Sequence, residues 1–183
     1  MEGKIIMRRN NIYITIFWSV VCIIVFILQI MGLFSFEKFA LYPPAVKSGE
    51  IYRILTGALM HGGLEHIAAN IFSFINIGSY CEINTNKKSY SLAIILSMLL
   101  SGLFITFFSN VYTVGFSGVV FGILGYFAVL LYKDDGQWDR SDLYLVGRML
   151  VPNIIVSFMP GVSLAGHAGG FLGGIIAGLL LIK

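Results

Sequence analysis

The hydrophobic positions of this chain fall into long apolar runs that short polar stretches separate. Six runs approach the ~20 residues that a helix needs to cross a bilayer. We expect spans at residues 12–34, 63–80, 90–108, 117–132, 143–158 and 164–182. The pattern therefore predicts an all-α membrane protein, a bundle of six transmembrane helices that forms one domain over residues 1–183, with a short N-terminal tail at 1–11.

Composition agrees with a protein that lies in a lipid bilayer. Hydrophobic residues make up 57% of the chain and charged residues 11%, whereas a soluble domain carries about 25% charged residues. The formal net charge is only +3, and the cations lie mostly between the runs. We therefore expect no nucleic acid as a partner. Cys22 and Cys81 lie in apolar surroundings and are expected to be buried free thiols, and no spacing of residues predicts a metal or a cofactor.

Basic residues indicate which side of the membrane each loop faces. Most lie on one side of the six-span topology: Lys4, Arg8, Arg9, Lys87, Lys88, Lys133, Arg140 and Lys183. The positive-inside rule puts this side, and with it both termini, in the cytoplasm. Three cations between the first two spans oppose the rule mildly, namely Lys38, Lys47 and Arg53.

The connection over residues 35–60 is too apolar and aromatic for a solvated loop. We expect a structured element that lies in the membrane interface and uses its aromatic side chains as anchors. Tyr42-Pro43-Pro44 predicts a turn or an extended segment within it.

Ser117 begins the fourth run, within Gly115-Phe116-Ser117-Gly118. At a helix N-terminus, a serine nucleophile would have free backbone N–H groups and the positive end of the helix dipole beside a developing oxyanion. The plain alternative is a small residue in a packed turn. The fourth run is short, so its start is expected below the outer membrane surface, where a cavity would let water reach it.

His167 lies inside the sixth run, and an ionisable residue at membrane depth is a functional candidate by default. We expect it to act as the general base for Ser117. His66 and Asn70 are spaced i, i+4 and share one face of the second span, where two donors could form an oxyanion hole. Structural hydrogen bonding between helices is the alternative for all three residues.

Small residues explain how a serine and a histidine on two helices could meet. The fourth span carries Gly118, Gly122 and Gly125, and the sixth carries Gly166, Gly170, Gly174 and Gly178, with Gly169 and Gly173 beside them. This spacing allows helix backbones to touch. The acidic residues that follow the fourth span, and Glu82 at the end of the second, fall on the cytoplasmic side. A Ser–His dyad is therefore expected rather than a triad.

With these motifs in this order, the chain resembles the rhomboid family of intramembrane serine proteases. The resemblance rests on residues 61–70 (HGGLEHIAAN), on 115–118 (GFSG) and on 167–170 (HAGG) with Gly174, and covers nearly the whole chain. Tyr52-Arg53 resembles a Trp-Arg pair of the family's first outer loop, and Glu82 matches an acid at the inner end of the second span.

The resemblance implies a serine endopeptidase that cleaves transmembrane segments of membrane-protein substrates near the outer leaflet. Ser117 would be the nucleophile and His167 the base, with Asn70, His66 and the Ser117 N–H around the oxyanion. Gly170 would be the close contact of span six with span four, and Phe121 would replace a tyrosine that packs on the histidine in some relatives. Pro152 and Met159-Pro160-Gly161 are candidates for a lateral gate and a cap, with a kink and a turn as the plain alternatives.

Two other functions fit a membrane protein of this size. One is an inactive rhomboid-like protein that binds and escorts membrane proteins, although such relatives usually lack the serine or the histidine. The other is a small transporter or channel with the polar residues along its pathway, which inverted repeats would support, although the sequence shows none. The compact form favours the plasma membrane of a prokaryote, with the active site opening to the extracytoplasmic side.

Overall fold

The computed structural model describes residues 11–133, 140–159 and 161–182. Within them the chain folds into nine helices: α1 (Tyr13–Ile30), α2 (Phe36–Phe39), α3 (Pro43–Lys47), α4 (Arg53–Leu59), α5 (Leu64–Asn84), α6 (Lys87–Phe108), α7 (Ser117–Lys133), α8 (Arg140–Ser157) and α9 (Leu164–Leu181). In the described residues, β pairing is limited to one isolated bridge between Leu41 and Thr113. The predicted tail at 1–11 lies outside the described residues except for Asn11, as do the loop at 134–139, Pro160 and Lys183.

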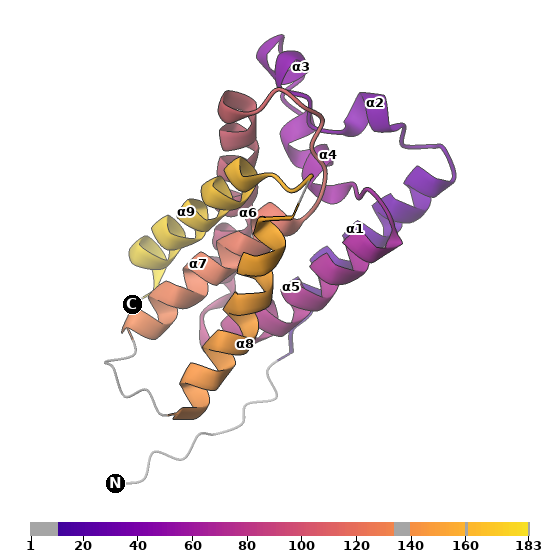
Figure 1. Ribbon diagram of the computed structural model, residues 1–183. Coiled ribbons are helices and arrows are strands. Elements are labelled where there is room, and N and C mark those ends of the chain that lie inside the picture. The colour runs from indigo at the N-terminus through magenta and orange to yellow at the C-terminus, as the bar shows by residue number, and fades with distance from the viewer. Residues whose placement is uncertain (1–10, 134–139, 160, 183) are drawn as a thin grey trace, which may run out of the picture.

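Each of the six predicted segments contains one long helix (Figure 1). Among the described helices, α1, α6 and α9 are long and apolar enough to cross a membrane, and α7 is a shorter apolar helix. The first helix ends at Ile30, before the predicted residue 34, because the chain turns at Gly32 with a φ of 76°. Helices α5 and α6 extend to Asn84 and from Lys87, so the two are joined by a tighter turn than the pattern predicted.

The connection between α1 and α5 is structured, as its composition predicted, and carries the three short helices α2, α3 and α4. The turn or extended segment expected at Tyr42-Pro43-Pro44 is found only at Tyr42, which is extended, because both prolines lie in the first turn of α3. Proline fits there because the first helical N–H groups need no intrahelical acceptor. Buried Arg53 holds the connection together, donating to the carbonyls of Glu37 and Ala40 at 2.7 and 2.9 Å.

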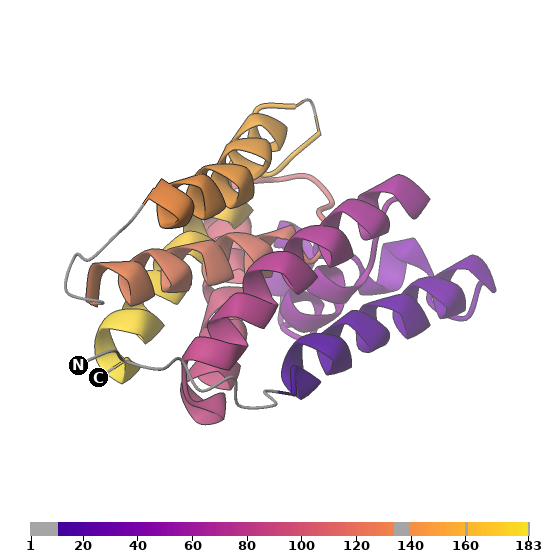
Figure 2. The same ribbon diagram turned by 90° about the horizontal axis from the view of Figure 1, so that it is seen from below.

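Helix α7 runs through the middle of the bundle, with α5, α6 and α9 around it (Figures 1 and 2). The contact of α7 with α9 is backbone to backbone. A Cβ atom placed on Gly170 would lie 1.9 Å from the Gly118 carbonyl oxygen, and one on Gly174 would lie 1.6 Å from that of Gly122. The glycine spacing therefore has the consequence expected from the sequence, a close approach of these two helices.

A second row of glycines brings α9 equally close to α6. A Cβ atom on Gly169 would lie 2.5 Å from the Leu100 carbonyl oxygen, and one on Gly173 would lie 2.8 Å from the Ser97 Cα. Helix α9 therefore packs tightly between α6 and α7, and these contacts hold His167 in place relative to α7.

Glu82 ties α1 to the end of α5 that lies farthest from Ser117. Its carboxylate accepts hydrogen bonds from the Ile14 and Thr15 backbone N–H groups at 3.0 and 2.8 Å, from the Thr15 hydroxyl at 2.7 Å and from Lys87 at 2.8 Å. The side chain therefore caps the N-terminus of α1, where free N–H groups and the helix dipole favour an anion. Cys22 and Cys81 are buried free thiols, as expected.

Helix α8 lies at the edge of the bundle (Figure 2). Its main helix neighbour is α5, and it packs against the rest of the bundle far less closely than α7 or α9 does. Pro152 lies inside it and cannot donate a hydrogen bond to the preceding turn.

Candidate active site

A tight turn before α7 places Ser117 at the first position of the helix. Gly115 has a φ of 124°, a conformation that residues with a Cβ rarely adopt. Its N–H donates to the Gly57 carbonyl oxygen at 3.0 Å. A Cβ atom on Gly115 would also lie 2.7 Å from the His66 ring, so both the backbone conformation and the space require glycine here.

His61 holds the same turn from the other side, and sequence reasoning gave this residue no role. Its ring is fully buried, with Nδ1 lying 3.1 Å from the Leu59 carbonyl oxygen and Nε2 accepting the Phe116 N–H at 3.4 Å. One nitrogen faces an acceptor and the other a donor, which is the pattern of a neutral imidazole. Burial, together with the charge of nearby His66, lowers the pKa of His61 to about 4.

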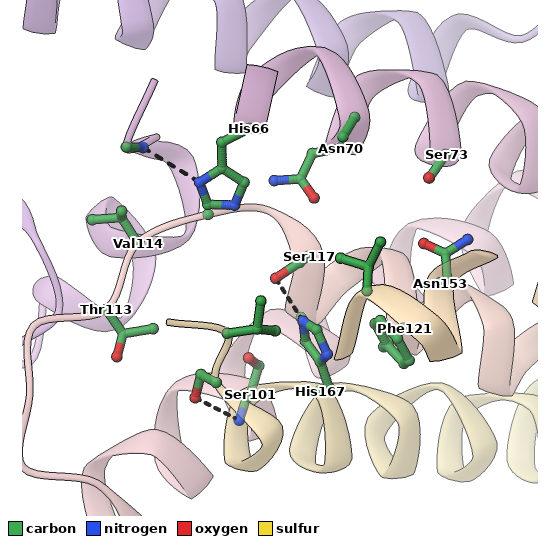
Figure 3. A pocket seen from close by; sticks show the side chains of 18 of the residues that line it. His66, Asn70, Ser73, Ser101, Thr113, Val114, Ser117, Phe121, Asn153 and His167 are labelled. Carbon is green, nitrogen blue, oxygen red and sulfur yellow. Dashed lines mark hydrogen bonds between the residues drawn. The ribbon is translucent and has the colours of Figure 1, made fainter. Parts of the chain in front are cut away.

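The structure brings Ser117 and His167 together. The Ser117 hydroxyl lies 2.9 Å from Nε2 of His167, which α9 supplies (Figure 3). His167 is 4% exposed, and Phe121, one turn after Ser117, stacks on its ring with centroids 4.0 Å apart and planes inclined by 12°. The phenylalanine therefore makes the ring contact that the family resemblance implied for it.

The second nitrogen of the His167 ring also has a partner. Nδ1 lies 2.9 Å from the hydroxyl of Ser157, the last residue of α8, and that hydroxyl donates to the Asn153 carbonyl oxygen at 3.0 Å. Sequence reasoning missed Ser157, because nothing in the local pattern indicates which face of α8 approaches α9.

His66 and Asn70 lie on α5 and face Ser117 (Figure 3). Asn70 is 7% exposed, and its amide nitrogen has no hydrogen-bond partner within the described part of the chain. His66 Nδ1 accepts the Gly62 N–H at 3.4 Å. Buried amide donors are rarely left unpaired, so the Asn70 amide marks a position where an acceptor is expected to bind.

These residues line one large pocket with a volume of about 860 Å³. His66, Asn70, Ser117 and His167 form one part of its wall, and α8 contributes another through Met149, Pro152, Asn153 and Val156. Among the described residues, no group of three or more histidine, cysteine, aspartate or glutamate side chains could hold a metal ion. The arrangement offers a hydroxyl beside a base, together with an unpaired donor, in a cavity that a polypeptide segment could enter.

A family profile described as the Rhomboid domain matches residues 48–183. The chain is 33% identical over 137 residues to L523 of Acanthamoeba polyphaga mimivirus, which is named as a rhomboid protein. The alignment covers 70% of this chain and 74% of the viral one. It is 28% identical over 126 residues to the Inactive RHOMBOID-like protein 8 of Arabidopsis thaliana, covering 67% of this chain and 36% of the plant protein.

A third relative carries the name of an enzyme. The chain is 28% identical over 142 residues to the Rhomboid protease GluP of Bacillus subtilis, covering 74% of this chain and 27% of the bacterial protein. The chain thus spans little more than a third of this plant relative and about a quarter of the bacterial one. The relatives come from a virus, a plant and a bacterium, and include both a named protease and a named inactive protein.

Proposed function

The chain belongs to the rhomboid family, and from that premise we propose that it is an intramembrane serine endopeptidase that cleaves transmembrane segments of other membrane proteins. The observation that carries this proposal is the 2.9 Å hydrogen bond between the Ser117 hydroxyl and His167 Nε2 inside the pocket. A nucleophile in direct contact with a general base is the minimal equipment for acyl transfer.

In the proposed reaction, the Ser117 oxygen attacks the scissile carbonyl carbon while His167 Nε2 takes the hydroxyl proton. The C–N bond then breaks, the leaving amine receives that proton from His167, and an acyl-enzyme ester remains on Ser117. A water molecule then gives a proton to His167 and attacks the ester carbonyl carbon. The C–O bond to Ser117 breaks, His167 returns the proton to the Ser117 oxygen, and the carboxylic acid leaves. In both steps His167 acts first as a general base and then as a general acid, so a dyad suffices.

The oxyanion formed at each attack needs hydrogen-bond donors. The Ser117 N–H belongs to the first turn of α7, where backbone N–H groups have no intrahelical acceptor. The unpaired amide of Asn70 and the ring of His66 face the same space. We assign these three groups to the oxyanion hole, where each donor typically lowers the barrier enough to accelerate the reaction ~10²–10³-fold.

Six spans and an extracytoplasmic site follow from this proposal. Helix α7 has 17 residues and is about 25 Å long, shorter than the ~30 Å apolar core of a bilayer. Ser117 would thus lie below the membrane surface. Lys133 is at the other end of α7, where it donates to the Leu179 and Ile182 carbonyls near the C-terminus. The positive-inside rule favours a cytoplasmic location for that end and for both termini, and we propose the plasma membrane of a prokaryote as the membrane.

The proposed substrate is a transmembrane helix that can unwind. A helical segment hides its carbonyl groups in intrahelical hydrogen bonds, so the segment must become extended before Ser117 can attack. Glycine and other residues that weaken helices are therefore expected near the cleavage site. Helix α8, the most loosely packed wall of the pocket, is the proposed side of entry.

Cleavage in liposomes tests the proposal. Purified protein is reconstituted with a single-span substrate that carries a glycine pair in the outer half of its span, and with a matched substrate in which both glycines are leucine. We expect cleavage of the first substrate to be faster, and cleavage of both to stop in Ser117→Ala and His167→Ala variants that still fold. Cleavage that persists in the folded Ser117→Ala variant would overturn the proposal.

The plant relative named as inactive supports one alternative function, the binding of membrane proteins without cleavage. Both functions use the same pocket, but only the protease needs the Ser117 hydroxyl. Equal affinity of the wild-type and Ser117→Ala proteins for the single-span substrate, with no cleavage by either, would support the alternative.

A further inference from the structure

The His167 ring is held at both nitrogens. Ser117 lies 2.9 Å from Nε2 and Ser157 lies 2.9 Å from Nδ1. The reaction proposed above uses only the first contact. Ser157 is 7% exposed, so its hydroxyl is shielded from bulk water, which would otherwise compete for the ring nitrogen.

The partners of Ser157 favour one of the two tautomers of the His167 ring. The Asn153 carbonyl oxygen can only accept, and it lies 3.0 Å from the Ser157 hydroxyl, which favours donation of the single hydroxyl proton to Asn153. Toward His167 the same oxygen must then accept, which requires a proton on Nδ1. In a neutral imidazole, Nε2 is then unprotonated and free to accept the proton of Ser117.

Other contacts with the ring do not select this tautomer. Phe121 stacks on the face of the ring, with planes inclined by 12°, and so restricts its tilt. A face contact is indifferent to which edge nitrogen carries the proton. Without an acceptor at Nδ1, the ring is free to adopt the tautomer with hydrogen on Nε2, which cannot deprotonate Ser117.

We propose that Ser157 is a positioning residue that holds His167 in the tautomer and orientation in which Nε2 acts as the base. This inference rests on the proposed function. During attack, the Ser117 proton moves to Nε2 and the ring becomes an imidazolium. Nδ1–H continues to donate to Ser157, whose own proton stays on its oxygen and points at Asn153. No proton leaves through Ser157, and the ring gives the transferred proton to the leaving amine.

The hydrogen bond also connects the base to the wall of the pocket. Ser157 and Asn153 belong to α8, which lies at the edge of the bundle (Figure 2), whereas His167 belongs to the tightly packed helix α9. The orientation of the base thus depends on a helix that is packed more loosely than the one that carries it.

Three variants test the inference. Ser157→Ala removes the hydroxyl, and Ser157→Thr keeps it. Ser19→Ala is the matched control, because Ser19 is 4% exposed and also donates to the carbonyl four residues before it, at 2.8 Å, but lies on α1, away from the pocket. The kcat and KM for the single-span substrate are measured, together with the rate at which a fluorophosphonate probe labels Ser117.

We expect Ser157→Ala to lower both kcat and the labelling rate roughly tenfold with KM unchanged, since one hydrogen bond is lost. Ser157→Thr should stay within about threefold of wild type by the same reasoning, and Ser19→Ala should match wild type. Unchanged kcat in a folded Ser157→Ala protein would overturn the inference. So would a change in KM alone, which would indicate a substrate contact, or an equal loss in the threonine variant.

A spectroscopic readout separates failure of this inference from failure of the proposed function. Nitrogen-15 NMR of histidine-labelled protein distinguishes the two imidazole tautomers, with His167→Gln used for assignment. We expect wild-type His167 to carry hydrogen on Nδ1 and Ser157→Ala to populate the other tautomer, even in a protein that cleaves nothing. Hydrogen on Nε2 of wild-type His167 would contradict the inference whatever the activity.

Discussion

Adding one methyl group at Gly170 should separate the two helices that carry Ser117 and His167. In Gly170→Ala, the new Cβ atom would lie 1.9 Å from the Gly118 carbonyl oxygen, whereas real Cβ contacts are essentially never shorter than 3.0 Å. The backbones must therefore move apart by at least 1.1 Å, the difference between these two distances. Neither atom can move aside alone, because one belongs to the α7 backbone and the other is fixed to the backbone of α9.

The consequence for the Ser–His contact follows from its position. Gly118 directly follows Ser117, and Gly170 lies less than one turn after His167. An opening of 1.1 Å there would lengthen the 2.9 Å hydrogen bond to about 4 Å, beyond hydrogen-bond range. A misplacement of about 1 Å costs an enzyme roughly 10²-fold in rate, and overpacking costs ~1–3 kcal/mol of stability.

The assay compares kcat, the rate of fluorophosphonate labelling and the thermal midpoint in detergent. Gly147→Ala is the matched control, because Gly147 is also helical but a Cβ atom there meets nothing within 4 Å. We expect Gly170→Ala to lose about 100-fold in kcat and labelling, and the control to retain both. A folded Gly170→Ala protein with kcat within a few-fold of wild type would show that this glycine contact does not set the distance between Ser117 and His167.

Three further predictions follow from buried polar groups. Glu82→Gln replaces an acceptor of two backbone N–H groups with an amide and should lower the free energy of unfolding by about 1–3 kcal/mol; denaturant titration should show this loss, and none in Glu65→Gln, whose side chain is exposed. Asn70→Ala should lower kcat ~10²–10³-fold. The thermal midpoint should not fall, because the amide nitrogen has no hydrogen-bond partner among the described residues to lose. Unchanged kcat would contradict the assignment of Asn70 to the oxyanion hole. The pKa of His61 falls from 6.5 to about 4 on burial. Between these values the unfolded state binds more protons, so the stability of the fold should decrease as pH falls from 6.5 toward 4. Thermal midpoints across this range should depend less on pH in His61→Gln, and an equal dependence would contradict a lowered pKa of His61.

Local patterns predicted the helices, and the glycine spacing together with the family resemblance predicted the meeting of Ser117 with His167. Apolar runs define helices, and small residues four apart allow two backbones to touch, so glycines on α7 and α9 bring neighbouring residues together. The i, i+4 spacing of His66 and Asn70 likewise fixed their common face. The helices and the common face of His66 and Asn70 need only the periodicity of a helix.

What the sequence could not predict depends on how one helix is placed against another. Ser157 reaches His167 through the rotation and depth of α8, and His61 reaches the Phe116 N–H through the path of a loop. Neither quantity is encoded in the spacing of residues along one helix. The start of α3 at Pro43 was missed for a different reason, because two prolines fit a first helical turn as well as they fit an extended segment.

The most direct test of the Ser117–His167 pair is the intact mass of the protein after reaction with a fluorophosphonate. We expect one phosphonyl adduct, mapped by peptide sequencing to Ser117, and no adduct in Ser117→Ala and His167→Ala proteins that keep the wild-type thermal midpoint. A folded wild-type protein that gains no adduct, or that gains it on another residue, would contradict the claim that this pair forms a catalytic dyad.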